Sequence, residues 1–300
     1  MQLKGVEIED TFAEAFTMYG SRVIVTARNE KWARTAAREA VGFATSIIEC
    51  GIEAGLEKEL LPEETSDGRP GCSLLFFTMK KESMLNELTK RIGQTIMTAA
   101  TTSCFNGLHT DEKIKVGGNL RYFGDGYQIS KLYSDRRFWR IPIMSGEFLI
   151  EESFGIKKGL GGGNFLIIGE DSQAALEAAE KAVAAVHRLN DVIMPFPGGI
   201  VSSGSKVSSK YKFLNASTNT PYCPTIKAQV KDSMLTKNAG SVLEIVIDGL
   251  STQAVSDAMA VGIKNACIPG IIKITAGNYG GDLGTENIYL HEILRGDLDE

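Results

Sequence analysis

A glutamate inside a β-branched stretch is the side chain of this sequence best placed for acid–base chemistry. Residues 241–250 are Ser-Val-Leu-Glu-Ile-Val-Ile-Asp-Gly-Leu, a pattern that predicts a strand ending at Asp-Gly. Alternation places Glu244 on the same strand face as Val242 and Val246. If that face is open to water, Glu244 is an ordinary solvated side chain. If another segment covers it, desolvation raises its pKa and gives a carboxylic acid that can donate a proton near neutral pH.

A glycine- and serine-rich segment at residues 199–206 allows two further chemistries. Ser203 and Lys206 have the S-x-x-K spacing of acylating serine enzymes, which requires both side chains on one helical turn. Gly204 and the glycines upstream disfavour a helix, so the stronger interpretation is a cradle for an anion or polar substrate, formed by Ser203, Ser205, Lys206 and nearby amides. Serine also precedes lysine here, whereas a P-loop needs the lysine first.

Three other kinds of residue have a functional and a structural interpretation. Arg69, in a Gly-Arg-Pro turn, can anchor a carboxylate or phosphate by its planar fork, or be a surface arginine. Phe123, Tyr127 and Phe196 can stack on a flat heterocycle, although aromatic residues near strands more often belong to the core. The glycine run at 159–163 precedes a strand, which favours a tight turn over a dinucleotide-binding loop.

Length and composition narrow the class of protein. A chain of 300 residues exceeds the usual size of one core and suggests two domains or a duplicated unit. The net charge of −5 argues against a nucleic-acid partner, and with no long apolar run or signal core we expect a cytoplasmic protein. Five scattered cysteines predict free thiols, and three histidines without ligand spacing predict no metal site.

The predicted elements follow one order twice, βαββαβ. The first set comprises strands at 22–27, 45–50, 73–79 and 95–101, with helices at 31–42 and 81–92. The second comprises strands at 164–169, 192–196, 241–250 and 271–275, with helices at 172–189 and 252–266, then a terminal strand at 287–291. Short aromatic strands at 120–127, 138–144 and 147–152 lie between the two sets.

This order predicts an α+β fold of two ferredoxin-like (split βαβ) lobes, a duplication, joined by a β meander. We expect an N-terminal lobe plus meander arm at residues 1–155 and a C-terminal lobe at 156–300. The C-terminal lobe contains a loop at 197–237, longer than a compact domain normally carries. Such loops are usually lids, binding segments or oligomer arms, so this one indicates a functional site.

Several long segments along the whole chain resemble one family, formylmethanofuran:tetrahydromethanopterin formyltransferase. They are Gly-Val-Glu-Ile-Glu-Asp-Thr-Phe-Ala-Glu-Ala-Phe at 5–16, Glu-Thr-Ser-Asp-Gly-Arg-Pro-Gly at 64–71, Gly-Gly-Gly-Asn-Phe at 161–165, Pro-Phe-Pro-Gly-Gly-Ile at 195–200, Ser-Gly-Ser-Lys at 203–206, Glu-Ile-Val-Ile-Asp-Gly-Leu at 244–250 and Ala-Gly-Asn-Tyr-Gly-Gly at 276–281. One departure is Asp282, where the family usually has lysine.

The resemblance implies reversible formyl transfer between N-formylmethanofuran and tetrahydromethanopterin, by direct transfer in a ternary complex. It implies no permanently bound cofactor or metal, methanofuran and tetrahydromethanopterin as cosubstrates, and a cytoplasmic homo-oligomer, typically a tetramer. The family's proposed acid/base falls on Glu244, which favours the covered interpretation of its strand. The expected substrate-binding residues are Arg69, Phe123, Asp125, Tyr127, Asn164, Phe196, Ser203, Ser205, Lys206 and Asn278.

Residues 119–131 and 138–144 resemble the methylotrophic-bacterial branch of the family more than the methanogen branch. In that branch the protein is similar to one subunit of a formyltransferase/hydrolase complex that works toward formate in one-carbon metabolism. An alternative function is therefore a non-catalytic methanofuran-binding subunit of such a complex.

Overall fold

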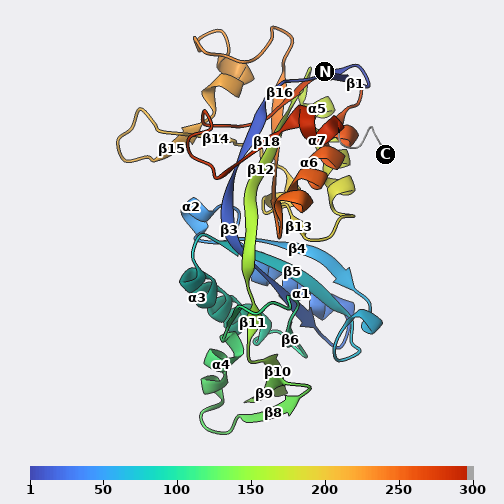
Figure 1. The fold of residues 1–300 in the computed structure, drawn as a ribbon, viewed down its shortest axis with the longest axis vertical. Helices are drawn as coiled ribbons and strands as arrows, with labels where there is room; N and C mark the ends of the chain where they lie inside the picture. The colour runs from blue at the N-terminus through green and yellow to red at the C-terminus, as the bar shows by residue number, and fades with distance from the viewer. Residues whose placement is uncertain (296–300) are drawn as a thin grey trace.

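Two long strands run through both lobes and join them (Figure 1). In the computed structural model, which describes residues 1–295, these strands are β3 (Phe12–Thr26) and β12 (Lys157–Gly169). They pair antiparallel where the lobes meet, with residues 157–161 opposite 16–20. Because both lobes build on these shared strands, their sheets are continuous, and the overall fold is the expected α+β class.

The N-terminal lobe packs two helices against four strands in the order β4–β5–β3–β6. The elements are α1 (Glu30–Val41), β4 (Glu53–Leu60), β5 (Gly71–Thr78), α3 (Lys81–Arg91) and β6 (Ser103–Asn106). Helix α1 begins where the Asn29 side chain accepts a hydrogen bond from the Trp32 N–H, and its buried face is made of alanines. These small residues let the helix lie close to Phe76 and Leu74 of β5 in one hydrophobic core.

The C-terminal lobe repeats this arrangement with strands in the order β13–β16–β12–β17. Its elements are α5 (Ser172–Val186), β13 (Val192–Ile193), β16 (Ser241–Gly249), α6 (Thr252–Ala266) and β17 (Ile271–Thr275). Asp171 and Ser251 cap the two helices by accepting backbone N–H bonds. Ile245 and Ile247 point from β16 into the core beneath α5 and α6.

The first fifteen residues pack on the second lobe, next to the segment at residues 286–295. Strands β1 (Gln2–Leu3) and β2 (Val6–Ile8) precede β3, and β2 pairs parallel with β17. Strand β18 (Glu286–Tyr289) pairs with β3 and leads into α7 (Leu290–Arg295). Val6, Ile8, Ala13 and Ala15 belong to the C-terminal core. The predicted division of the chain into lobes at residues 155 and 156 stays a prediction. These early residues precede that division in the sequence, but they pack in the core of the C-terminal lobe.

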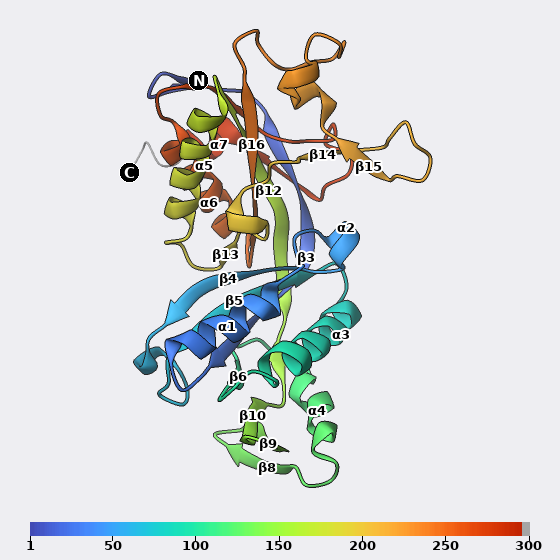
Figure 2. The ribbon, with the colours of Figure 1, turned by 180° about the vertical axis from the view of Figure 1, so that it is seen from behind.

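An arm projects from the N-terminal lobe, at the opposite end of the molecule from the N-terminus and helix α7 (Figures 1 and 2). It consists of β8 (Ile129–Tyr133), β9 (Arg136–Ile143) and β10 (Gly146–Glu151), with α4 (Val116–Leu120) and a 3₁₀ turn (Arg121–Gly124) beside them. Short strands β7 (Lys113–Ile114) and β11 (Phe154–Gly155) close its base. The three-strand part confirms two of the predicted meander strands.

Three predicted strands are wrong, because these residues form helices and turns and not extended backbone. Residues 45–50 contain helix α2 (Ile47–Cys50), since Ser46 caps its start and Gly51 ends it in the left-handed conformation. Residues 95–101 comprise the end of a π-helical segment (Ile92–Ile96) that continues α3, and the turns that follow it. Residues 120–127 are helical turns that end on Asp125, whose φ of 50° is also left-handed.

The glycine run at 159–163 does not form the predicted tight turn. It lies within strand β12. The register of β12 against β16 shifts between Leu160 and Gly163, and Gly162 has a φ of 82°. A β-bulge with a glycine in this conformation bends the strand without breaking it. All five cysteines are free, as predicted. In residues 1–295, no helix has the length and apolar character required to cross a membrane.

Candidate active site

Glu244 lies in the middle of β16, on the face turned away from the helices of its lobe. The long loop 197–237 pairs with the edge of β16 opposite β12, where Val201 and Glu244 form an isolated antiparallel bridge with N···O distances of 2.8 and 3.0 Å, and its Gly204 then lies against the Glu244 carboxyl group. Figure 2 shows the loop on one side of β16 and β12 and helices α5 and α6 on the other. The side chain of Glu244 is therefore covered, which is the condition under which the sequence pattern predicts an acid.

Burial raises the pKa of Glu244 to about 7. Desolvation destabilises the carboxylate form. Among residues 1–295, no hydrogen-bond donor or cation lowers the pKa in compensation. The loop passes so close that a Cβ at Gly204 would lie 2.7 Å from Oε2 of Glu244. Only glycine leaves room for the carboxyl group at this point. The geometry thus keeps a protonatable, half-buried carboxyl group at the wall of a cavity.

Two adjoining cavities meet at Glu244. The larger, about 390 Å³, opens toward the β17 end and the loop after it, and the smaller, about 50 Å³, lies under the Ser203 turn. Glu244, Asn219 and Tyr222 line both. The larger cavity is also lined by Thr11, Asn164, Ser205, Lys206, Thr275 and Asn278, among others. A small-molecule group can therefore approach the carboxyl from the solvent side.

A row of paired residues crosses three strands at this level of the sheet. Glu244 on β16 is opposite Leu166 on β12, which is opposite Thr275 on β17. Tyr222, from the long loop, hydrogen-bonds to Thr275. Burial raises the pKa of Tyr222, while the Thr275 contact opposes that rise. A neutral tyrosine hydroxyl group thus lies in the same cavity as the Glu244 acid.

The rim of the larger cavity is a glycine-rich loop at residues 277–284, the rim loop, which is held by the side chain of Glu14. This buried carboxylate accepts four backbone N–H bonds, from Tyr279 (2.6 Å), Gly281 (3.1 Å), Leu283 (2.5 Å) and Gly284. Burial alone would raise the pKa of Glu14, but these four donors outweigh it and hold the pKa below its ordinary value. Tyr279 is thereby fixed at the cavity wall, and burial with the charges of Glu244 and Glu14 raises its pKa.

Five of the predicted binding residues lie around these cavities with Glu244. Ser203 lines the smaller cavity, and Asn164, Ser205, Lys206 and Asn278 line the larger. The Asn164 amide bonds to Gly162 and to both backbone groups of Gly277, at 2.6–3.1 Å, so it holds the rim loop in place.

Lys206 donates to Oγ1 of Thr220 at 2.7 Å, which ties the hairpin of β14 (Ser205–Val207) and β15 (Ala216–Thr218) to the following turn. Ser203 to Lys206 is a bend leading into β14, and no helix forms there. The two side chains therefore lack the helical spacing that an acylating serine requires.

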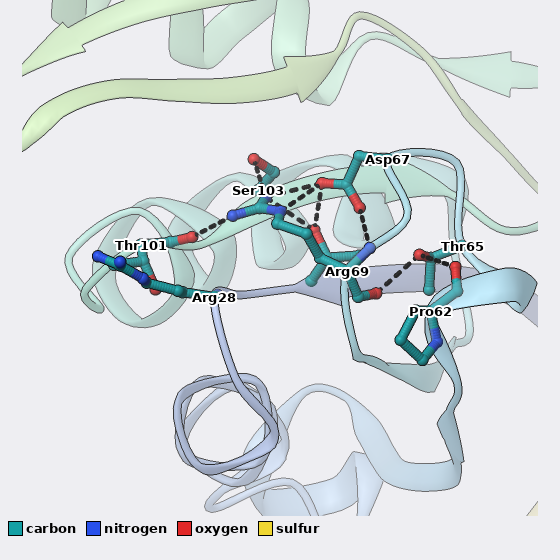
Figure 3. A network of polar contacts seen from close by, with 8 residues as sticks. Arg28, Pro62, Thr65, Asp67, Arg69, Thr101 and Ser103 are labelled. Carbon is teal, nitrogen blue, oxygen red and sulfur yellow. Dashed lines mark hydrogen bonds and ion pairs between the residues drawn. The ribbon is translucent and has the colours of Figure 1, made fainter.

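Arg69 does not reach these cavities, and Figure 3 shows where its guanidinium group points. It donates to Asp67 at 2.8 Å, to the Thr101 carbonyl at 2.6 Å, and to the hydroxyl oxygens of Thr26 and Ser103 at 3.0 and 2.7 Å. These bonds occupy most of its donors. Within one chain, Arg69 locks the turn after β4 onto the sheet of the N-terminal lobe.

The other predicted residues are spread over the molecule. Phe123, Asp125 and Tyr127 belong to the turn beside the arm, where the two aromatic rings are exposed. Phe196 is half-buried at the start of the long loop and lines neither cavity. These four residues remain predictions, because the chain by itself does not bring them to Glu244.

Sequence reasoning missed four residues of the site: Glu14, Asn219, Tyr222 and Tyr279. Tyr279 and Glu14 both lie within motifs that carry the family resemblance, which was a usable signal. Tyr222 lies between two prolines inside the long loop, a rigid setting that suits a fixed side chain. In residues 1–295, no cluster of histidine, cysteine and acidic side chains could hold a metal ion.

The comparisons with known proteins cover both lobes. The family model for formylmethanofuran-tetrahydromethanopterin formyltransferase matches residues 1–143, and that for the proximal lobe of the same enzyme matches residues 146–293. The formyltransferase of Methylococcus capsulatus is 53% identical over 98% of this chain and 100% of its own. That of Methanothermobacter thermautotrophicus is likewise 53% identical over 98% of this chain and 100% of its own.

Solved structures agree. The formyltransferase from Methanosarcina barkeri has a TM-score of 0.93 at 47% identity, covering 98% of this chain and 100% of its own. A chain of the formyltransferase/hydrolase complex from Methylorubrum extorquens, determined with methylofuran, has a TM-score of 0.95 at 46% identity, covering 98% of each chain. The chain therefore belongs to the formylmethanofuran–tetrahydromethanopterin formyltransferase family.

Proposed function

We propose that this protein transfers a formyl group reversibly between N-formylmethanofuran and tetrahydromethanopterin, in a ternary complex of both carriers. The observation that carries the proposal is Glu244, a carboxyl group with a pKa of about 7 between two adjoining cavities, in a chain that matches the family from end to end. Binding both carriers at once removes most of the translational entropy cost of their encounter.

The reaction exchanges one C–N bond for another. A pterin nitrogen attacks the formamide carbon, and negative charge develops on the carbonyl oxygen. The protonated Glu244 donates a hydrogen bond to this oxygen and stabilises it. The methanofuran nitrogen then leaves as an amine with a proton, the pterin nitrogen loses one, and Glu244 relays the proton between them.

Purified protein with formylmethanofuran and tetrahydromethanopterin tests the proposal. We expect 5-formyltetrahydromethanopterin to form from these two substrates alone, with no metal or further cofactor added. A protein that binds formylmethanofuran but forms no product would instead be the alternative, a non-catalytic methanofuran-binding subunit of a formyltransferase/hydrolase complex. The similarity to a chain of such a complex is the observation that favours this second candidate.

A serine acyl-enzyme is the weakest candidate, since Ser203 and Lys206 do not share a helix and Lys206 donates to Thr220. A formyl adduct on Ser203, detected by mass spectrometry after quenching, would support it. Direct transfer leaves no adduct.

We also propose that each lobe is ferredoxin-like and that the two arose by duplication. The strand orders β4–β5–β3–β6 and β13–β16–β12–β17 support this, because each places the second, third, first and fourth strands of a βαββαβ unit side by side.

The protein is further proposed to form a cytoplasmic homotetramer. Exposed apolar side chains on the arm, including Phe123, Tyr127, Tyr133 and Met144, support an assembly that covers this surface. The predicted roles of Arg69, Asp125 and Phe196 in binding belong to the same proposal, since an assembled partner could present them to another chain's cavity. Sedimentation equilibrium on the purified protein measures the state directly, and a monomer at micromolar concentration would contradict it.

A further inference from the structure

Two acidic side chains meet where the lobes join. Asp248 lies on β16, four residues after Glu244 and on the same strand face, and is 0% exposed. Glu53 lies at the start of β4 in the other lobe and is 9% exposed. Their carboxyl groups face each other across the junction within hydrogen-bonding reach. Two ionised carboxylates are both acceptors only, so a hydrogen bond between them requires a proton on one of them.

The surroundings of Asp248 leave one of its oxygens for this proton. Oδ1 accepts the Gly162 N–H at 2.9 Å, while Oδ2 is buried without a donor among the described residues. On the other side, Glu53 Oε1 accepts the Ile47 N–H at 2.8 Å. A proton on Oδ2 of Asp248, donated to the Glu53 carboxylate, satisfies each group with no further partner.

No cation of the described residues neutralises the pair. Glu53 is the one charged side chain that bears on the pKa of Asp248, and the other neighbours are Gly161 and Gly162 of β12, Ile193 of β13 and Met18 of β3, which crowds Gly161. Burial, then the charge and hydrogen bond of Glu53, raise the pKa of Asp248 well above its ordinary value, against the Gly162 N–H. Burial likewise raises the pKa of Glu53.

A second buried carboxylate of β4 is instead neutralised by an arginine. Glu57, also on β4, accepts two bonds from Arg22 at 2.6 and 2.7 Å and the backbone N–H of Asp191 at 2.7 Å. Arg22 also pairs with the Asp191 carboxylate. Strand β4 therefore makes two polar contacts with the second lobe. An arginine neutralises one of them, and no positively charged side chain of the described residues neutralises the other.

We propose that Asp248 and Glu53 hold one proton between them, and that this acid–carboxylate hydrogen bond fixes β16 against the N-terminal lobe and so positions Glu244. The first part stands on the packing of the junction alone. The link to Glu244 rests on the proposed function. Asp248 is a positioning residue, since it lines neither cavity.

Infrared spectroscopy detects the proton directly, in the full-length protein at pH 7. The measurement uses an E244Q background, so that Glu244 contributes no carboxylic acid band. We expect a C=O stretch of a buried carboxylic acid that disappears in D248N and changes frequency in E53Q, because the acid loses its carboxylate acceptor. The band should persist unshifted in D257N, which changes an exposed aspartate of the same lobe. An identical spectrum in all four proteins would overturn the shared proton.

Thermal unfolding gives an independent readout. The folded pair binds a proton that the unfolded chain releases above its ordinary pKa, so the melting temperature of the wild type falls as the pH rises toward the folded pKa. The side-chain amide introduced by D248N can donate to Glu53 while still accepting from Gly162, and it does not titrate. We expect the melting temperature of D248N, relative to wild type, to rise by roughly 2–4 °C per pH unit between pH 5 and 8. Parallel curves for D248N, D257N and wild type would contradict the proposal.

Kinetics test the link to Glu244. D248L fills the volume but removes both hydrogen bonds, so we expect kcat to fall by up to about a hundredfold while KM changes less than about threefold. D248N should recover part of that loss, and D257N should match the wild type. An unchanged kcat in D248L would overturn the positioning role. If D248L does not fold, the same measurement is made on E53L, which removes the other carboxyl group of the pair. If the wild type proves inactive, the infrared and melting experiments still decide whether the proton is shared.

Discussion

The backbone of Glu244 is paired with that of Val201, the residue at which the long loop first meets the sheet. The two N–H···O bonds between them, 2.8 and 3.0 Å, fix the loop over the carboxyl group that it desolvates. The acid and its cover are thus one local unit, which explains why a strand glutamate can have a pKa near 7.

Replacing Glu244 by glutamine should lower kcat by about a hundred- to a thousandfold, because an amide cannot relay the proton from the pterin nitrogen to the departing amine. Glutamine keeps the shape of the side chain, so substrate dissociation constants should change little. Steady-state kinetics and calorimetric titration of each carrier measure the two quantities. Glu286→Gln, an exposed strand glutamate, is the control. Near-normal turnover would remove Glu244 from the mechanism.

The pH dependence of turnover should follow the Glu244 carboxyl group. Its acid form predominates below its pKa of about 7, so kcat should be highest there and fall about tenfold per pH unit well above it. This applies to the direction in which methanofuran is released. The residual rate of Glu244→Gln should lack this limb. A limb of the same position and slope in the variant would assign the titration to another group.

Changing Gly204 to alanine should separate catalysis from stability. The new Cβ would lie 2.7 Å from Oε2 of Glu244, the flexible end of a side chain, so the carboxyl group is expected to move while the backbone stays. We expect kcat to fall at least about tenfold with a melting temperature within about 2 °C of wild type. Gly42→Ala, whose Cβ meets only ordinary contacts, is the matched control. Unchanged kcat would show that the carboxyl position is not critical.

Changing Glu14 to glutamine should loosen the rim loop. The amide NH₂ replaces an acceptor, so at least one of the four backbone N–H groups loses its partner, at a cost of about 1–3 kcal/mol in unfolding free energy. Because the folded pKa of Glu14 is lowered, its stabilising contribution is present above the unfolded value and is lost as the pH falls through the folded pKa. The difference in unfolding free energy between Glu14→Gln and the wild type should therefore become smaller as the pH falls.

Hydrogen exchange of the amides of Tyr279, Gly281 and Gly284 measures this loosening locally, and chemical denaturation at pH 4 and pH 7 measures the difference in unfolding free energy. Glu180→Gln, at an exposed helix position, controls for the loss of one charge. Unchanged protection of these amides would show that the loop is held by other contacts.

Changing Arg69 to lysine should reduce stability more than substrate binding. Lysine has no planar fork and cannot reproduce the bonds to Asp67, Thr101, Thr26 and Ser103 together, so we expect a loss of about 1–3 kcal/mol. Arg28→Lys, at an exposed neighbouring arginine, is the control. A rise in KM without a change in stability would favour the binding role that the resemblance predicts for Arg69.

Local sequence specified the helices and strands wherever a full pattern and its caps lay within a few residues of each other. Helix α6 and strand β17 have the predicted bounds, because Ser251 caps the helix and a β-branched run follows its end. The same local logic failed at residues 45–50, where a serine cap and a left-handed glycine outweighed β-branched residues. It also identified Glu244 as the unusual residue of its strand.

The packing of distant segments made that glutamate an acid. Desolvation depends on which distant segment covers a side chain, and a strand pattern does not encode the approach of Gly204 or the Val201 bridge. The meeting of Glu53 with Asp248 was likewise invisible in sequence, because it arises from two strands of different lobes. Burial and pairing are properties of the packed chain, and they set the pKa values on which the chemistry depends.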